Sequence, residues 1–174
     1  MHPQPDTHLR PLAEQLLEQL AVEEGLLRHA REGVMGLYSA LRKGDLPAVQ
    51  AAVPANDALA GRLAAAAEQR QAAATRLAAA VGLAGESFTL ASLADRTPEP
   101  YRSGLRTTRA KLRDLTAQVD QFRAANANLI DRLRSYFRDI LSPVTAADAP
   151  VRYGPSGAVV TAAASAASAV VVSG

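Results

Sequence analysis

The sequence contains no cysteine and no tryptophan, and aromatic residues make up only 4% of its 174 residues. Without cysteine the chain has no disulfide, no thiolate nucleophile and no thiolate metal ligand. Its only histidines are His2, His8 and His29, which offer neither an acid–base pair nor a histidine metal cluster. It also lacks a glycine-rich phosphate loop and a Gly-x-Ser-x-Gly nucleophile motif. We therefore expect a protein that is not an enzyme, with no catalytic residues, no metal and no cofactor.

Targeting and membrane signals are also missing. The first eight residues have neither the basic start nor the apolar stretch of a secretion signal. Residues 153–174 carry no charge, but their apolar residues are mostly alanine with a few valines and are interrupted by Ser, Thr and Gly, so we expect no stable membrane insertion. Together with the absence of cysteine, these features predict a cytoplasmic location.

The charge balance gives little support for a nucleic-acid partner. The chain has 19 basic and 17 acidic residues, a formal charge of +2. Between residues 99 and 141 there are nine Arg or Lys residues against five Asp or Glu, but acidic residues alternate with the basic ones at salt-bridge spacing. We therefore expect no nucleic acid as partner; the alternative, binding through this basic segment, requires strongly salt-dependent retention of DNA or RNA.

What the sequence does contain favours helices. Alanine and leucine dominate, and the residues that usually form strands are scarce before residue 143. Apolar residues recur at alternating steps of three and four in three segments, which predicts an elongated antiparallel bundle or coiled coil of three long helices. We expect the bundle over residues 9–142, a flexible N-terminus over 1–8 and a disordered tail over 143–174. The stripes comprise Leu9, Leu12, Leu16, Leu20, Leu27, Val34, Leu37 and Leu41; Leu59, Leu63, Ala66, Ala73, Leu77 and Val81; and Leu105, Leu112, Leu115, Val119, Phe122, Leu129, Leu133, Tyr136 and Ile140.

Glycine and proline predict the helix boundaries. Gly44 suits the left-handed residue after a helix, Asp45 can cap the next helix, and Pro47 fits its first turn. We expect Pro54 to interrupt that helix, so that the second long helix runs from about Asn56 to Val81. Residues 82–100 are a connector in which residues 89–94 form one helical turn. Pro143 is expected to end the third long helix.

The end of the third segment is apolar over a surface wider than one coiled-coil seam requires. Two interpretations are open: both sides pack into the bundle, or the surface receives an amphipathic segment of another protein. Asn126 and Asn128 stand at its start, where a polar residue either restricts helix register or contacts a partner. The apolar surface consists of Leu129, Ile130, Leu133, Tyr136, Phe137, Ile140 and Leu141.

The elements follow a recognisable order: a first helix closing at 43–46, an Ala-, Glu- and Arg-rich second helix, the connector at 89–94, and a third helix with Asn126-Ala127-Asn128-Leu129-Ile130. Shortly after the third helix stands the most distinctive part, a Tyr-Gly-x-x-Gly segment, Tyr153-Gly154-Pro155-Ser156-Gly157. Over residues 9–157 this order resembles the FlgN family of flagellar type III export chaperones.

This resemblance implies a cytoplasmic chaperone that binds hook-associated proteins of the hook–filament junction, prevents their premature assembly and delivers them to the export gate. The client-binding residues it implies are Asn126, Leu129, Ile130, Leu133, Tyr136, Phe137, Ile140 and Leu141. Tyr153, Gly154 and Gly157 are the residues it assigns to docking on the export-gate membrane protein. The alternative is a coiled-coil structural or adaptor protein without a client, in which the same surface closes a homodimer.

Overall fold

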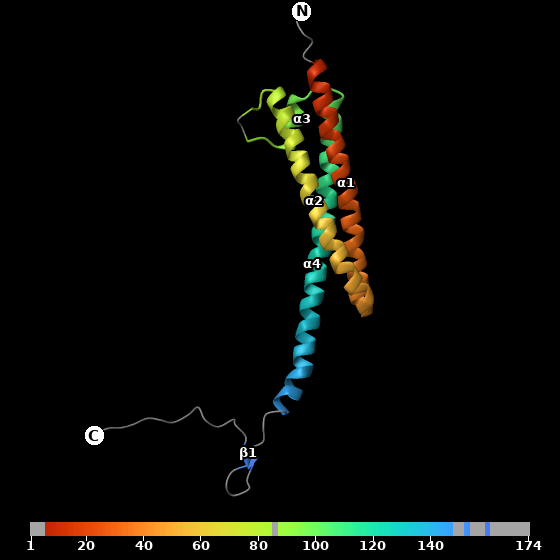
Figure 1. Ribbon diagram of the computed structural model, residues 1–174, viewed down its shortest axis with the longest axis vertical. Coiled ribbons are helices and arrows are strands. Elements are labelled where there is room, and N and C mark those ends of the chain that lie inside the picture. Colours follow the sequence, from red (N-terminus) through yellow and green to blue (C-terminus); the bar gives the residue numbers. More distant parts are fainter. Residues whose placement is uncertain (1–5, 85–86, 148–151, 154–158, 161–174) are drawn as a thin grey trace, which may run out of the picture. The chain divides into compact units, whose positions relative to one another are not determined.

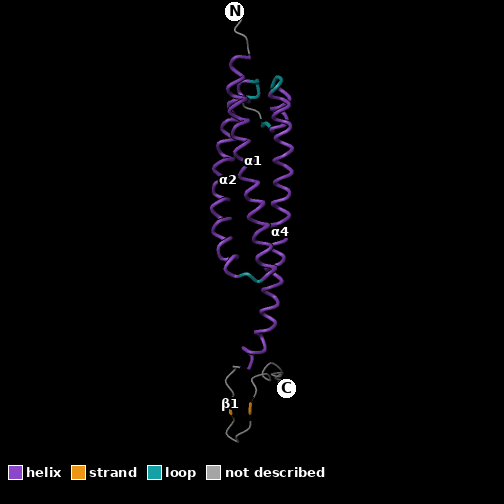
Figure 2. Tube along the Cα trace, turned by 90° about the vertical axis from the view of Figure 1, so that its right-hand side faces the viewer, coloured by secondary structure: helices purple, strands orange, loops and turns teal. Residues whose placement is uncertain are grey.

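The computed structural model describes residues 6–84, 87–147, 152–153 and 159–160. These residues form four helices and one pair of short strands (Figures 1 and 2). The helices are α1 (Asp6–Lys43), α2 (Leu46–Ala80), α3 (Leu90–Arg96) and α4 (Tyr101–Ala147), and the strands are β1 (Arg152–Tyr153) and β2 (Val159–Val160). The expected all-α class is thus confirmed. The chain divides into two compact units, Met1–Asp131 and Arg132–Gly174.

In the first unit α1 and α2 lie side by side and run in opposite directions, and residues 101–131 of α4 pack along them (Figure 1). The apolar stripes meet in one core, because residues three and four apart share a face of a helix. Most of the buried residues that α2 contributes to this core are alanines. Because the alanine side chain is small, the neighbouring helices can approach closely. The fully buried leucines of this core are Leu16, Leu20, Leu77, Leu93 and Leu105.

The turn between α1 and α2 has the predicted chemistry. Gly44 adopts a left-handed conformation with φ of 67°, which costs glycine little because it has no Cβ. The Asp45 carboxylate accepts a hydrogen bond of 3.1 Å from the backbone amide of Ala48, and Pro47 lies in the first turn of α2. The predicted end and restart of the helix at this turn are confirmed.

Two predicted proline boundaries are wrong. Helix α2 begins at Leu46 and continues through Pro54, and α4 continues past Pro143 to Ala147. A proline inside a helix removes one backbone hydrogen bond and crowds the preceding turn. Pro54 is exposed, so its ring requires no space in the core. The packing of α2 along α1 therefore outweighs the loss at Pro54, and Pro143 lies only four residues before α4 ends.

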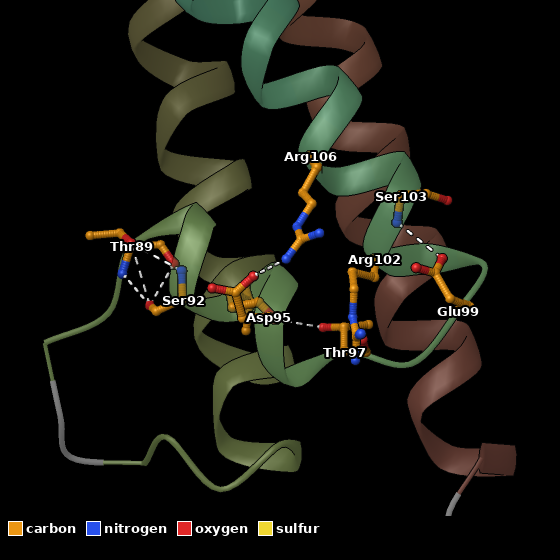
Figure 3. Close-up of polar contacts among 9 residues, drawn as sticks. Thr89, Ser92, Asp95, Thr97, Glu99, Arg102, Ser103 and Arg106 are labelled. Atoms are coloured by element: carbon orange, nitrogen blue, oxygen red, sulfur yellow. Dashed lines mark hydrogen bonds and ion pairs between the residues drawn. The ribbon is translucent and has the colours of Figure 1, made fainter.

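The connector before α4 contains α3, where a single helical turn was expected. Thr89 caps it reciprocally with Ser92: the Thr89 hydroxyl accepts from the Ser92 amide at 3.1 Å, and the Ser92 hydroxyl accepts from the Thr89 amide at 2.9 Å (Figure 3). Asp95 on α3 then pairs with Arg106 on α4, with 2.6 Å between Oδ1 and Nη2. The capping box and the ion pair fix a short helix that periodicity alone could not delimit.

The second unit contains residues 132–147 of α4 and the two strands, which pair antiparallel with Tyr153 opposite Val159. The tail expected to be disordered over 143–174 therefore contains helix up to residue 147 and paired backbone at 152–153 and 159–160. Its other residues lie outside the described part of the chain. At the N-terminus α1 already begins at Asp6, inside the segment expected to be flexible, and residues 1–5 are not described. None of the helices within the described ranges is long and apolar enough to cross a membrane.

Candidate functional site

In the second unit, α4 presents large apolar side chains to solvent. Tyr136, Phe137, Ile140 and Leu141 are exposed to 61%, 57%, 47% and 54% of their surface. Their spacing of one, four and five residues places them on one face of the helix, and the Tyr136 and Phe137 rings meet edge to face with 6.0 Å between centroids. Leu133, one turn earlier, is half-buried. We call Tyr136, Phe137, Ile140 and Leu141 the α4 apolar patch.

The start of the predicted surface lies in the first unit and is built differently. Asn126 is only 5% exposed, and its side-chain Nδ2 donates a 3.0 Å hydrogen bond to the backbone oxygen of Val34 on α1. Leu129 and Ile130 are half-buried, whereas Asn128 is exposed. The structure therefore places Asn126 between helices, where it ties α4 to α1.

Beside Asn126 the three long helices line a groove with a volume of about 320 Å³, here called the amide groove. Most of its walls are apolar, and exposed Asp57 and Arg123 are its charged members. Its polar side chains also include Asn56 from α2 and Asn126 from α4. The apolar wall residues are Ala30, Val34, Leu37, Leu59, Ala60, Leu63, Ala127 and Ile130.

Two buried polar atoms of the amide groove lack a hydrogen-bond partner within the described residues: Nδ2 of Asn56 and Oδ1 of Asn126. A buried polar group without a partner costs about 1–3 kcal/mol, so native proteins contain few of them. Asn56 is held against α1 at Gly33, where a methyl group would overlap the Asn56 side-chain oxygen. The groove therefore contains one unused donor and one unused acceptor.

Sequence reasoning missed Asn56 and therefore the groove. It placed Asn56 at the start of the second helix, whereas the residue lies eleven positions after Asp45, the N-cap of α2. The available signal was Gly33, a glycine inside the predicted first helix, because a glycine in a helix interior often marks close approach of another group.

Away from the groove, three more buried polar atoms lack a hydrogen bond within the described residues, Oε2 of Glu23, Nε of Arg31 and Nε of Arg70, but their side chains make other polar contacts between helices. Glu23, which occupies a stripe position on α1, forms an ion pair with Arg70 of α2 with 2.9 Å between Oε2 and Nε. Arg31 donates to the Gln118 side chain on α4 at 3.2 Å. Both contacts connect helices of the first unit and explain how charged residues fit next to the core.

Electrostatic perturbation is found away from the predicted site. The hydrogen bond from Arg106 holds the pKa of the exposed Asp95 carboxyl below its ordinary value, assisted by the charges of Arg106, Arg102 and Arg109. Within the described ranges, no group of three or more His, Asp or Glu side chains could hold a metal ion.

The Tyr-Gly-x-x-Gly segment falls partly in β1. The backbone of Tyr153 pairs with Val159, while Gly154 and Gly157 lie outside the described residues.

One comparison with known proteins gives a match. The family model described as FlgN protein matches residues 12–161, a segment that contains most of α1, the other three helices, both strands and the Tyr153-Gly154-Pro155-Ser156-Gly157 segment. No curated protein and no solved structure matches the chain. Because the family match spans most of the 174 residues, the chain belongs to the FlgN family.

Proposed function

We propose that this protein is a flagellar export chaperone that binds hook-associated proteins of the hook–filament junction in the cytoplasm, prevents their premature assembly and delivers them to the type III export gate. Membership of the FlgN family supports the general class of flagellar export chaperone. The observation that carries the client-binding step is the exposed α4 apolar patch.

A patch of this kind suits a helical client segment. Two aromatic and two aliphatic side chains on one helix face can pack against the apolar face of an amphipathic helix from another protein. Burying one such side chain contributes about 1.5–3 kcal/mol, so a few of them carry most of the binding energy. Asn126, Leu129, Ile130 and Leu133 are further client contacts in this proposal. The chemistry is binding alone, without a catalytic step.

The export-gate contact is proposed for the segment that begins at Tyr153. A tyrosine offers a large apolar ring and a hydroxyl at low cost in conformational entropy. Gly154 and Gly157 next to it allow close approach of a partner backbone. Support for this step comes from the Tyr-Gly-x-x-Gly pattern inside the matched family segment.

The test is capture of proteins from a lysate of the source organism, followed by mass spectrometry. Tagged wild type is compared with Phe137→Asp, with Tyr153→Ala and with Ser135→Asp, a matched control that places the same charge at an exposed position on the opposite face of α4. We expect hook-associated proteins on wild type, Ser135→Asp and Tyr153→Ala, and their loss from Phe137→Asp. Capture of no flagellar protein by any version overturns the proposal.

The exposed α4 apolar patch also supports a second candidate, a coiled-coil adaptor that only self-associates through this surface. That candidate predicts a concentration-dependent dimer in sedimentation equilibrium, which Phe137→Asp dissociates. A monomer at all concentrations rules it out.

A further inference from the structure

The lining of the amide groove indicates which chemical group of a client would fit it. Its walls are largely aliphatic, and two of its lining residues each carry a buried amide atom without a hydrogen-bond partner, Nδ2 of Asn56 and Oδ1 of Asn126. Asn126 is buried to 95% and its other amide atom is already bonded to Val34. The orientation of the Asn126 amide is therefore set, and its oxygen remains the atom that needs a donor.

The occupant that matches this arrangement offers an N–H and a C=O on the same small group, attached to an apolar stem. A carboxylate supplies acceptors only, and an ammonium supplies donors only. The backbone of a helical client is already saturated by its own hydrogen bonds. A side-chain carboxamide has a donating NH₂ beside an accepting oxygen, which complements one free acceptor and one free donor.

We propose that the amide groove is a second client contact, and that it takes the side-chain carboxamide of an asparagine or glutamine set among apolar residues of the client. This inference rests on the proposed chaperone function. The amide's NH₂ donates to Oδ1 of Asn126, its oxygen accepts from Nδ2 of Asn56, and its aliphatic stem lies against Val34, Leu59 and Ile130. In this proposal the partly exposed Asn56 side chain turns to meet the occupant.

The groove also provides specificity by exclusion. A client side chain that is purely apolar leaves both atoms without partners, and a site with unused buried polar groups discriminates strongly against analogues that lack the matching group. A carboxylate places its charge against the Asn126 oxygen and is repelled. The proposed contact therefore selects among clients that all satisfy the α4 apolar patch.

The first experiment uses small probes on the full chain and needs no client. 4-Methylpentanamide, 4-methylpentanoate and 4-methyl-1-pentanol are titrated while the side-chain NH₂ signals of Asn56 and Asn126 are followed by NMR. We expect the amide to shift both signals saturably and to bind at least about tenfold more tightly than the acid or the alcohol. Equal binding of the three probes, or no shift because water alone fills the groove, overturns the proposal.

Matched variants test whether the amide probe binds at Asn56 and Asn126. Asn126→Leu and Asn56→Leu should each weaken amide binding at least about tenfold, whereas Asn128→Leu, which changes the exposed asparagine two positions along α4, should leave it unchanged. Because Asn56 and Asn126 are on different helices, one variant remains informative if the other fails to fold. Unaltered amide binding in a folded Asn56→Leu variant contradicts the assignment.

The second experiment uses the hook-associated protein that wild type captures. Each Asn or Gln of its bound segment is changed to Leu, and one of these changes should weaken binding at least about tenfold. If none does while capture persists, the groove assignment is wrong and the chaperone function stands. If wild type captures no such protein, the chaperone function fails, and the probe titration still decides the chemistry of the groove.

Discussion

Asn126 on α4 donates a hydrogen bond to the backbone oxygen of Val34 on α1 across 3.0 Å. The residue is buried, and within the part of the chain that the structure describes its own oxygen has no partner. Position 126 therefore requires a neutral donor, because any charge there is cut off from water.

Asn126→Asp tests this requirement. At neutral pH the carboxylate cannot donate to Val34 and is repelled by its oxygen, so the folded state should lose about 2–4 kcal/mol. Burial raises the pKa of the new carboxyl in the folded state, so the stability that is present below the unfolded-state pKa is lost as pH rises from that value through the folded-state pKa, and it recovers in acid. Urea unfolding at pH 7 and pH 4 measures the effect. The exposed control, Asn128→Asp, should change little at either pH, and an equal loss in both variants contradicts the account.

Pro54→Ala should stabilise the protein. Pro54 lies inside α2 and is exposed, so alanine restores a backbone hydrogen bond without disturbing the core. The expected gain is about 1–3 kcal/mol, reduced by the added freedom of the unfolded chain. Pro47→Ala is the control, because a first-turn proline gives up a donor that has no helical partner. Thermal unfolding followed by circular dichroism should rank Pro54→Ala above wild type and Pro47→Ala at or below it.

Leu77→Ala should be among the costly single changes in the bundle. Leu77 is fully buried in the core formed by α1, α2, α3 and α4, and removing such a leucine leaves a cavity that costs about 2–5 kcal/mol. Leu46→Ala changes a leucine of the same helix that is 62% exposed, and should cost less than about 1 kcal/mol. Chemical denaturation of both variants measures the difference, and similar losses at the two positions count against the helix packing described.

Arg106 sets the titration of Asp95. In Arg106→Gln the pKa of Asp95 should rise toward its ordinary value, because the hydrogen bond is the largest of the effects that lower it. Arg109→Gln should raise it less, since Arg109 acts by charge alone. Because the folded-state pKa is lowered, the contribution of the pair is present above the unfolded-state pKa of Asp95 and is lost as pH falls through the folded-state value. Carboxyl NMR titration of the three proteins decides the point, and identical Asp95 curves are incompatible with the ion pair.

Much of the fold could be predicted from local patterns. The alternating steps of three and four identify the core faces, and leucines such as Leu16, Leu20 and Leu105 are buried where the stripes place them. Gly44 and Asp45 predict the turn after α1 because the conformation and the cap depend on those residues alone. The helix boundaries predicted at Pro54 and Pro143 are wrong, because whether a proline breaks a helix also depends on how the surrounding helices pack. Local sequence rules do not include that packing.

Of the candidate site, too, one part could be predicted from local sequence patterns and another part depends on helix packing. The α4 apolar patch follows from the excess of apolar residues over what one seam needs, and the structure exposes those side chains. Whether they bind a client remains a prediction. For the amide groove the sequence offers only one signal, Gly33, because Asn56, Gly33 and Asn126 are far apart along the chain and come together only when three helices pack.

The measurement that tests the central claim most directly is hydrogen exchange of the full chain, alone and with the hook-associated protein that it captures. The account predicts that client binding slows amide exchange over residues 129–141 of α4, and that Phe137→Asp removes this protection while Ser135→Asp keeps it. Client binding that leaves exchange over residues 129–141 unchanged contradicts the account.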